Sequence, residues 1–228
     1  MYKRQPILLN SLTSVVTTSD AGAGVGYTGI RIRGINAQST NITINGIPYN
    51  DAESLGTYWV DLPDFASSVE NLQVQRGVGT STNGSSAFGA SINILTDLIS
   101  KTPYFENSNS IGSYNTLKNT FKFSTGILND YFEFSGRLSK IDSDGYIDRS
   151  SSDLKSYFLQ VNYKKENTLI KALSFGGHEI TYQAWNGIDG ETLESDRTYN
   201  PSGMYIDQSG NIQSVSYTHL RAHETTSD

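Results

Sequence analysis

Residues 69–96 read VENLQVQRGVGTSTNGSSAFGASINILT and carry the strongest structural signal in this sequence. Val69, Leu72 and Val74 sit among polar residues, and apolar and polar residues alternate at 91–95, where a period of two is typical of β-strands. The segment between them is rich in glycine, including Gly84 and Gly89. Glycine accepts positive φ and lets one backbone pass close to another. The stretch therefore predicts two strands joined by a glycine-rich connection.

The composition favours a mainly β protein and excludes several functional classes. The 228 residues include 14 Tyr and 21 Gly, and their mean hydropathy is −0.41. No apolar run is long enough for a membrane-spanning helix, whereas the strands of a transmembrane β-barrel give a much weaker hydropathy signal. The net charge of −6, without a basic cluster, argues against a nucleic-acid partner. The absence of cysteine removes disulfide and thiolate chemistry.

The first sixty residues predict short elements separated by turns. Residues 7–16 have mixed three- and four-residue apolar spacing, which indicates a short helix. The glycines of residues 24–29 formally match a dinucleotide-binding pattern, but a period-two segment follows at 30–34 instead of a helix, so a turn is favoured. Residues 41–47 predict a hairpin with an Asn-Gly turn. Asp61-Leu-Pro-Asp-Phe predicts a capped helical turn.

Several of these segments together resemble one known family. In order they are IRIRG, NITINGIPYND, WVDLPDFASSVE, VENLQVQRG and NGSSAFGASINILT. The series resembles the plug domain of TonB-dependent outer-membrane receptors. On this resemblance we expect residues 6–98 to form an α+β plug domain that lacks its N-terminal part.

After Lys101 the sequence changes to longer alternating segments. They lie at 116–127, 131–141, 154–163 and 168–182, and a further strand is expected near 104–111. Short turns alternating with long loops are typical of outer-membrane barrels, although a soluble β-sandwich also has alternating strands. Lys, Glu and Arg in mid-strand, and Tyr or Phe at strand ends, favour the barrel.

The receptor resemblance continues through these segments, in GSYNT, SDGYIDRS and TYQAWNG. It implies that residues 101–215 are the start of a transmembrane β-barrel. The expected fold is mainly β: a plug followed by about five antiparallel barrel strands, which form an incomplete barrel.

The two ends do not resemble receptor sequence. Residues 1–5 and 216–228 look like translated adapter sequence, and we expect them to be non-native. His219 and His223 have a spacing suited to a metal, but they fall in this tail. We therefore expect no metal site.

No catalytic set is recognisable. Without cysteine, a nucleophile would be Ser or Thr with a histidine base, and His178 is the histidine outside the tail. It falls on an expected strand, and the sequence contains no G-x-S-x-G or H-E-x-x-H motif. We expect neither an enzyme nor a cofactor.

The family resemblance assigns a role to two Arg-Gly pairs, Arg33-Gly34 and Arg76-Gly77. It implies that these arginines form a lock with glutamates on the inner barrel wall, because a buried guanidinium without a carboxylate is costly. Ordinary exposed strand-end arginines are the alternative. Gly34 and Gly77, with Gly84 and Gly89, are the expected structural glycines.

The resemblance implies import of a scarce nutrient, such as an iron-siderophore chelate, across the outer membrane of a Gram-negative bacterium. The expected partners are the ligand, outer-membrane lipid and the energy-coupling protein TonB, whose binding box does not appear in this sequence. Tyr49, Asn50, Tyr58 and Trp59 are candidate ligand-binding residues. A plug-like binding or adhesion module without transport is the alternative.

Overall fold

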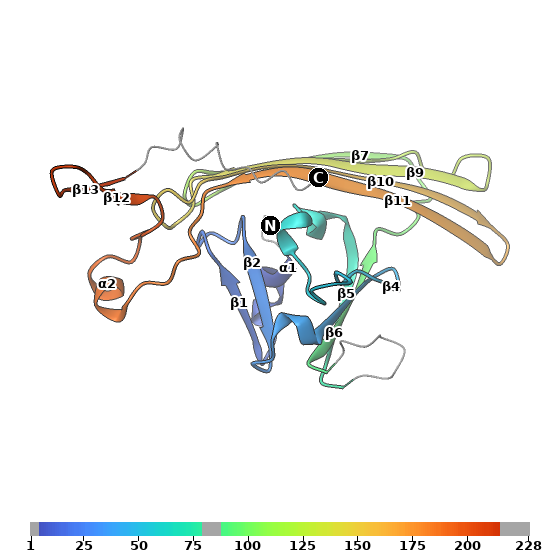
Figure 1. The fold of residues 1–228 in the computed structure, drawn as a ribbon. Helices are drawn as coiled ribbons and strands as arrows, with labels where there is room; N and C mark the ends of the chain where they lie inside the picture. The colour runs from blue at the N-terminus through green and yellow to red at the C-terminus, as the bar shows by residue number, and fades with distance from the viewer. Residues whose placement is uncertain (1–4, 79–87, 215–228) are drawn as a thin grey trace.

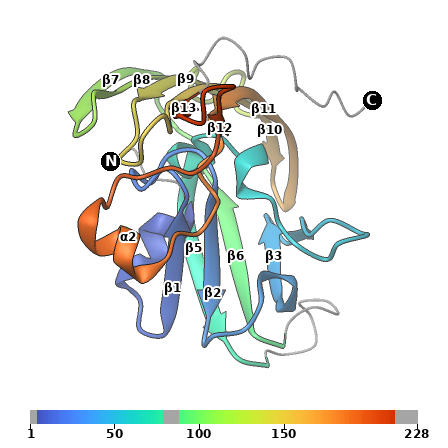
Figure 2. The same ribbon diagram turned by 60° about the vertical axis from the view of Figure 1, so that its left-hand side comes forward.

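The computed structural model describes residues 5–78 and 88–214 and places a long curved sheet over a smaller α+β unit (Figure 1). We call residues 5–97 the plug and the long sheet the wall. Figures 1 and 2 show the wall arching over one side of the plug, with the plug strands running away from it. The chain therefore has two layers, the plug and the wall, which pack against each other.

The plug consists of short helical turns and two small sheets. Its elements are α1 (Gln5–Leu8), η1 (Leu9–Ser11), β1 (Val15–Ser19), β2 (Thr28–Ile32), η2 (Ala37–Ser39), β3 (Thr40–Ile44), β4 (Ile47–Pro48), η3 (Trp59–Asp61), η4 (Phe65–Ser68), β5 (Val69–Arg76) and β6 (Ala90–Thr96). β1 and β2 form an antiparallel hairpin, and the second sheet has the order β4-β3-β6-β5. β5 and β6 pair antiparallel, as residues 69–96 predict, whereas β3 and β6 are parallel.

The expected helix at residues 7–16 is only partly correct. Helical turns end at Ser11, and Ser14 adopts a positive φ of 64° before β1 begins. Val15 and Val16 are β-branched and followed by two threonines, which favours an extended backbone over a helix.

One apolar core holds the plug together and reaches the wall. Ile92 and Ile94 of the central strand β6 are fully buried, because their face of the strand packs into this core. Trp59 and Phe65 pack into the same core from the helical turns, and Phe158 enters it from the wall. The plug and this part of the wall therefore share buried apolar surface.

The wall is a five-stranded, fully antiparallel sheet. Its strands are β7 (Tyr104–Gly112), β8 (Thr116–Ser124), β9 (Phe132–Ser143), β10 (Ser152–Lys165) and β11 (Thr168–Thr181), in the order β11-β10-β9-β8-β7. The expectation of about five antiparallel strands after the plug is confirmed. The boundary predicted between residues 98 and 101 falls in the segment between β6 and β7.

The wall exposes apolar side chains on its outer face and buries polar side chains on its inner face, which is the reverse of a soluble domain. On β9 the apolar Leu138 is 53% exposed, while its neighbour Arg137 is 2% exposed and Glu133 is 1% exposed. β10 shows the same alternation, with exposed Leu159 beside buried Gln160. An apolar outer face and a polar inner face are the pattern of barrel strands between lipid and lumen, and the pattern excludes the β-sandwich.

The connections distinguish the two ends of the wall. β10 and β11 are joined by a tight turn after Lys165, whereas residues 144–151 and the segment after β11 form long excursions at the opposite end. That segment contains α2 (Gly190–Ser195) and the hairpin of β12 (Met204–Ile206) and β13 (Ile212–Ser214). We call this the long-loop end (Figure 1, left). No helix of the described part of the chain is long and apolar enough to cross a membrane.

Candidate functional site

The contact between plug and wall is centred on one buried carboxylate, Asp64. This residue precedes η4 and adopts a left-handed conformation, with φ of 51°, which aspartate tolerates better than most residues. Its side chain makes no capping hydrogen bond to η4. The capped turn predicted from Asp61 is wrong in position, because η3 ends at Asp61 and the next turn, η4, begins at Phe65. The Asp64 carboxylate points across the interface to the wall instead.

Two cations from different wall strands pair with this carboxylate. Lys118 Nζ on β8 lies 2.6 Å from Asp64 Oδ1, and Arg137 Nη1 on β9 lies 3.0 Å from Oδ2. Ser139 also donates its hydroxyl to Oδ2, at 2.5 Å. All four residues are buried. We call this group, with the serines that follow, the Asp64 cluster.

Serine hydroxyls complete the hydrogen bonding of the two cations. Arg137 donates from Nε to Ser68 Oγ at 2.8 Å and from Nη1 to Ser156 Oγ at 2.9 Å. Lys118 donates to Ser67 Oγ at 2.6 Å. A buried charge is tolerated only when it is paired and hydrogen-bonded, and the cluster meets both conditions with groups from the plug and from three wall strands.

The electrostatics of the cluster keep Asp64 ionised. Burial acts to raise the pKa of the Asp64 carboxyl, but the positive charges of Arg137 and Lys118 and the hydrogen bonds outweigh it, so the pKa is lowered below its ordinary value of 3.8. At neutral pH the cluster therefore contains one anion facing two cations.

An aromatic contact lies next to the Asp64 cluster. Phe65, the residue after Asp64, has its ring centroid 5.8 Å from that of Phe158 and 5.0 Å from that of Phe175, both in edge-on geometry. Phe158 and Phe175 lie opposite each other on β10 and β11. Two adjacent plug residues thus supply one polar and one apolar anchor to the same region of the wall.

A second polar contact forms at the end of β6. Lys122 Nζ of β8 lies 3.3 Å from Asp97 Oδ2, and Gln160 Nε2 of β10 donates to the Asp97 carbonyl at 3.0 Å. Lys171 of β11 reaches the same carbonyl at 3.3 Å. The plug is therefore fixed to the wall at two points along its height, across four strands.

The predicted lock arginines lie away from this wall. Arg33 and Arg76 are exposed, and neither has an ion pair within the described residues. β5 leaves the wall after Ser68 and ends at Arg76, on the remote side of the plug (Figure 1). Arg76 Nη1 donates to the Thr13 carbonyl at 2.9 Å. The glutamate partners proposed for them stay a prediction.

The predicted structural glycines are required for two different reasons, a positive φ and a close approach of neighbouring atoms. Gly34 and Gly77 have φ of +73° and +85°, and a Cβ at Gly77 would lie 3.0 Å from Arg33 Nη1. Gly89 is needed for close approach, since its Cβ would lie 3.0 Å from Ser39 O. Gly84 lies outside the described residues, as do His219 and His223.

The four candidate ligand-binding residues have different surroundings. Trp59 is 3% exposed in the plug core, and Asn50 holds the backbone of Ile42 and Thr40 through its side-chain amide. Tyr49 is partly buried, its ring 6.4 Å from Phe175, and burial together with Asp61 raises its pKa. Tyr58 is 56% exposed and is the most accessible side chain of the four.

The sequence reasoning missed two parts of the site. The sequence predicts no partner for Asp64, although buried mid-strand cations such as Lys118 and Arg137 need a carboxylate. The sequence predicts only a turn for the glycine-rich segment before β2. In the structure this segment also contacts the wall, because the Ala21 carbonyl accepts a hydrogen bond from Tyr146 N of a wall loop at 2.8 Å. Tyr27, at the end of this turn, contacts Trp185, with ring centroids 5.2 Å apart.

Known proteins resemble this chain in sequence. The family model "TonB-dependent Receptor Plug Domain" matches residues 7–91. The vitamin B12 transporter BtuB of Vibrio vulnificus (strain YJ016) is 29% identical over 197 residues, which are 84% of this chain and 30% of that protein. The chain thus spans about 30% of the length of this curated relative.

Solved structures agree on the fold. The copper transporter OprC superposes with a TM-score of 0.66 at 16% identity, over 79% of this chain and 28% of that one. The alcaligin outer-membrane receptor FauA of Bordetella pertussis gives 0.60 at 13% identity, over 77% and 29%. The family model thus identifies residues 7–91 as a plug domain of the TonB-dependent receptors, and the chain as a whole resembles these receptors of the Gram-negative outer membrane in sequence and in fold.

Proposed function

We propose that this chain is the plug and first barrel strands of a receptor that imports a scarce nutrient, with energy delivered by TonB. The observation that carries the proposal is the Asp64 cluster, which fixes a folded plug to the inner face of membrane strands. A plug in this position closes a lumen, and its function requires both a stable closed state and a way to release.

The chemistry of the cluster suits this dual requirement. Breaking a buried ion pair by removing one partner costs about 3–5 kcal/mol, which holds the plug at rest. When the plug is displaced into a water-filled lumen, Asp64, Lys118 and Arg137 become hydrated, and hydration offsets much of the lost pairing. A charged junction therefore separates more readily in water than an apolar junction of equal area.

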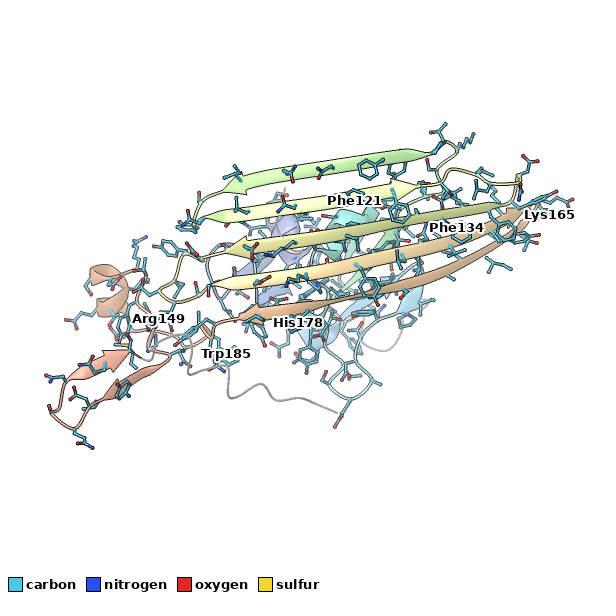
Figure 3. The ribbon with its side chains drawn as sticks, turned by 90° about the horizontal axis from the view of Figure 1, so that it is seen from above. Phe121, Phe134, Arg149, Lys165, His178 and Trp185 are labelled. Carbon is cyan, nitrogen blue, oxygen red and sulfur yellow. The ribbon has the colours of Figure 1, made fainter. Side chains whose placement is uncertain are left out.

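The ligand-binding face is proposed at the long-loop end. There the Tyr27 and Trp185 side chains meet, and they are 37% and 49% exposed. Figure 3 shows Trp185 beyond the end of the strands. Exposed aromatic rings on a rigid plug turn and a wall loop provide a surface for a bulky planar or chelated ligand.

For the substrate we propose an iron-siderophore or a similar metal chelate. Support comes from structural relatives of this chain, which include the alcaligin receptor FauA and the pyoverdine receptor FpvA. Vitamin B12 and copper, named for BtuB and OprC, are the alternative substrates, and both are also metal species or metal complexes.

The proposal is tested by uptake in cells that express a receptor carrying this chain. Accumulation of labelled ferric siderophores, cobalamin and copper is measured in strains with and without TonB. We expect TonB-dependent accumulation of at least one ferric siderophore. Accumulation of cobalamin or copper alone would contradict the proposed ferric-siderophore substrate and identify that compound as the substrate instead. Accumulation that does not require TonB would contradict the proposed mechanism.

The alternative, a binding or adhesion module without transport, makes a different prediction about location. Protease treatment of intact outer-membrane vesicles should leave β7–β11 protected if they lie in the bilayer. A wall that is digested, in a protein that stays soluble without detergent, would favour the module.

A further inference from the structure

A line of polar side chains crosses the outward face of the wall near its long-loop end. Residues in register on neighbouring strands share a face, and one such line consists of Asn109, Asn119, Lys140, Lys155 and His178. All five side chains are exposed. Figure 3 shows His178 on this face, between the apolar part of the sheet and the long loops. We call these five residues the polar row.

The polar row lies where the apolar band of the outward face ends. Along β10, Lys155 is followed on the outward face by Tyr157, Leu159, Val161 and Tyr163. The distance from Tyr163 to Lys155 is about 26 Å at the usual rise of a strand. A tilt of about 35–45° reduces this to about 20 Å of height, close to the apolar band of outer-membrane barrels. The row is therefore at headgroup level, in the leaflet on the long-loop side, which is the outer leaflet.

Like charges face each other across β9 and β10 at this level. Lys140 is directly opposite Lys155, and Asp142, one row nearer the loops, is directly opposite Asp153. Directly opposed like charges destabilise a strand pair. Exchanging Lys140 with Asp142 would have given two attractive pairs at no change in composition. The sheet therefore places two lysines side by side, with Asp142 and Asp153 one row nearer the loops.

The two lysines differ in what they already contact. Lys140 Nζ lies 3.0 Å from Asp142 Oδ2 on its own strand. Lys155 has no ion pair among residues 5–78 and 88–214. A hollow of about 840 Å³ lies over both lysines, and its lining also includes His178, Phe121 and Tyr157. Cations on its aqueous side and aromatic rings on its membrane side match an amphiphile with an anionic head.

We propose that the polar row binds the phosphate group of an outer-leaflet lipid. Lys140 and Lys155 supply two cations to the phosphate oxygens, and Asn119 and His178 supply further polar contacts. The acyl chains then lie along Phe121 and Tyr157 and the apolar side chains below them. The site goes beyond nutrient import, because it faces the membrane and not the lumen.

The test compares lipid binding by variants of a receptor that carries this chain, purified in mild detergent. The probes are bisphosphorylated lipid A and the same lipid with its phosphates removed, and bound lipid is measured by native mass spectrometry. Lys155→Ala should weaken binding of the phosphorylated lipid about tenfold. Lys165→Ala is the matched control, because it lies on the same face of the same strand at the opposite end (Figure 3).

A charge exchange separates binding from stability. The double variant Lys140→Asp with Asp142→Lys keeps the composition but places opposite charges across β9 and β10. We expect it to lose phosphorylated-lipid binding by more than tenfold while its melting temperature stays the same or rises.

Three results would overturn the proposal: the exchange variant binding as well as the parent, Lys165→Ala weakening binding as much as Lys155→Ala, or equal binding of the dephosphorylated lipid. Inorganic phosphate competing as well as the lipid, mole for mole, would identify free phosphate as the ligand and also overturn it. Nutrient uptake by the same variants is measured separately, so failure of the lipid site is distinguishable from failure of the transport proposal.

Discussion

Asp64 fixes the position of the plug in two directions at once. Its two carboxylate oxygens pair separately, one with Lys118 on β8 and the other with Arg137 on β9. A shift of the plug along the wall or across it would break at least one of these pairs. Because the cluster is buried, neither lost pairing would be replaced by water while the plug stays docked.

Replacing Asp64 by Asn should loosen the plug strongly. Asp64→Asn leaves Arg137 and Lys118 buried without a countercharge, which should reduce the stability of docking by about 3–5 kcal/mol. Denaturant unfolding followed by Trp59 fluorescence, in a Trp185→Phe background, measures the change. Asp142→Asn serves as the control, since it removes one partner of an exposed ion pair, and it should have a much smaller effect. Equal effects of the two substitutions would show that burial of the cluster is unimportant.

Acid should weaken the same contact. The pKa of Asp64 in the folded protein lies below its ordinary value of 3.8. A lowered carboxyl pKa contributes stability that is fully present above the unfolded value and is lost as the pH falls through the folded one. Docking should therefore hold at pH 5–7 and weaken below about pH 3.8. The slope of stability against pH, compared between the parent and Asp64→Asn, measures this, and an unchanged slope in the variant would contradict it.

At the scale of elements, β11 approaches the plug so closely that one position tolerates no side chain. A Cβ at Gly177 would lie 2.5 Å from the Lys155 carbonyl of β10 and would overlap Pro63 of the plug. Pro63 directly precedes Asp64, so this close approach and the buried ion pairs depend on the same plug segment. The turn before η4 thus sets the spacing between the two layers.

Gly177→Ala should therefore push the plug and wall apart. We expect a loss of about 1–3 kcal/mol from overpacking, read by the same Trp59 unfolding signal. Gly187→Ala is the matched control, because no atom lies within 4 Å of its added Cβ. A Gly177→Ala variant as stable as the control would show that the two layers can separate without cost.

At the scale of the whole molecule, the wall serves two different environments. Its inner face offers polar groups to the plug, and its outer face offers apolar side chains to lipid. The sequence contains no cysteine, so single cysteines can report each face without background. In membranes, Leu138→Cys should react with a lipid-soluble maleimide and Ser139→Cys should not. Equal labelling of both positions would contradict the membrane placement.

Sequence reasoning recovered the wall and much of the plug because both depend on local patterns. Strand alternation on β8–β10 and the glycine-rich connection after β5 are visible within short windows. The role of Asp64 is not visible in this way, since its partner Arg137 lies 73 residues away. The same Pro-Asp-Phe segment supports a helix cap or a tertiary ion pair, and only packing decides between them. The glutamate partners of Arg33 and Arg76 stay a prediction, because neither arginine has an ion pair among residues 5–78 and 88–214.

Because buried and exposed side chains alternate on β8–β10, the plug on one face and lipid on the other both constrain strand register. A slip of β9 by one residue would place Arg137 in the hydrocarbon and Leu138 against Asp64, so lipid and plug would each reject it. A slip by two residues keeps the faces but moves Arg137 away from Asp64, so contact with the plug also disfavours this error. The plug therefore helps to select the correct strand register as well as filling the space beside the wall. A wall that folds without the plug keeps its polar and apolar faces but lacks the Asp64 contacts that disfavour a two-residue shift.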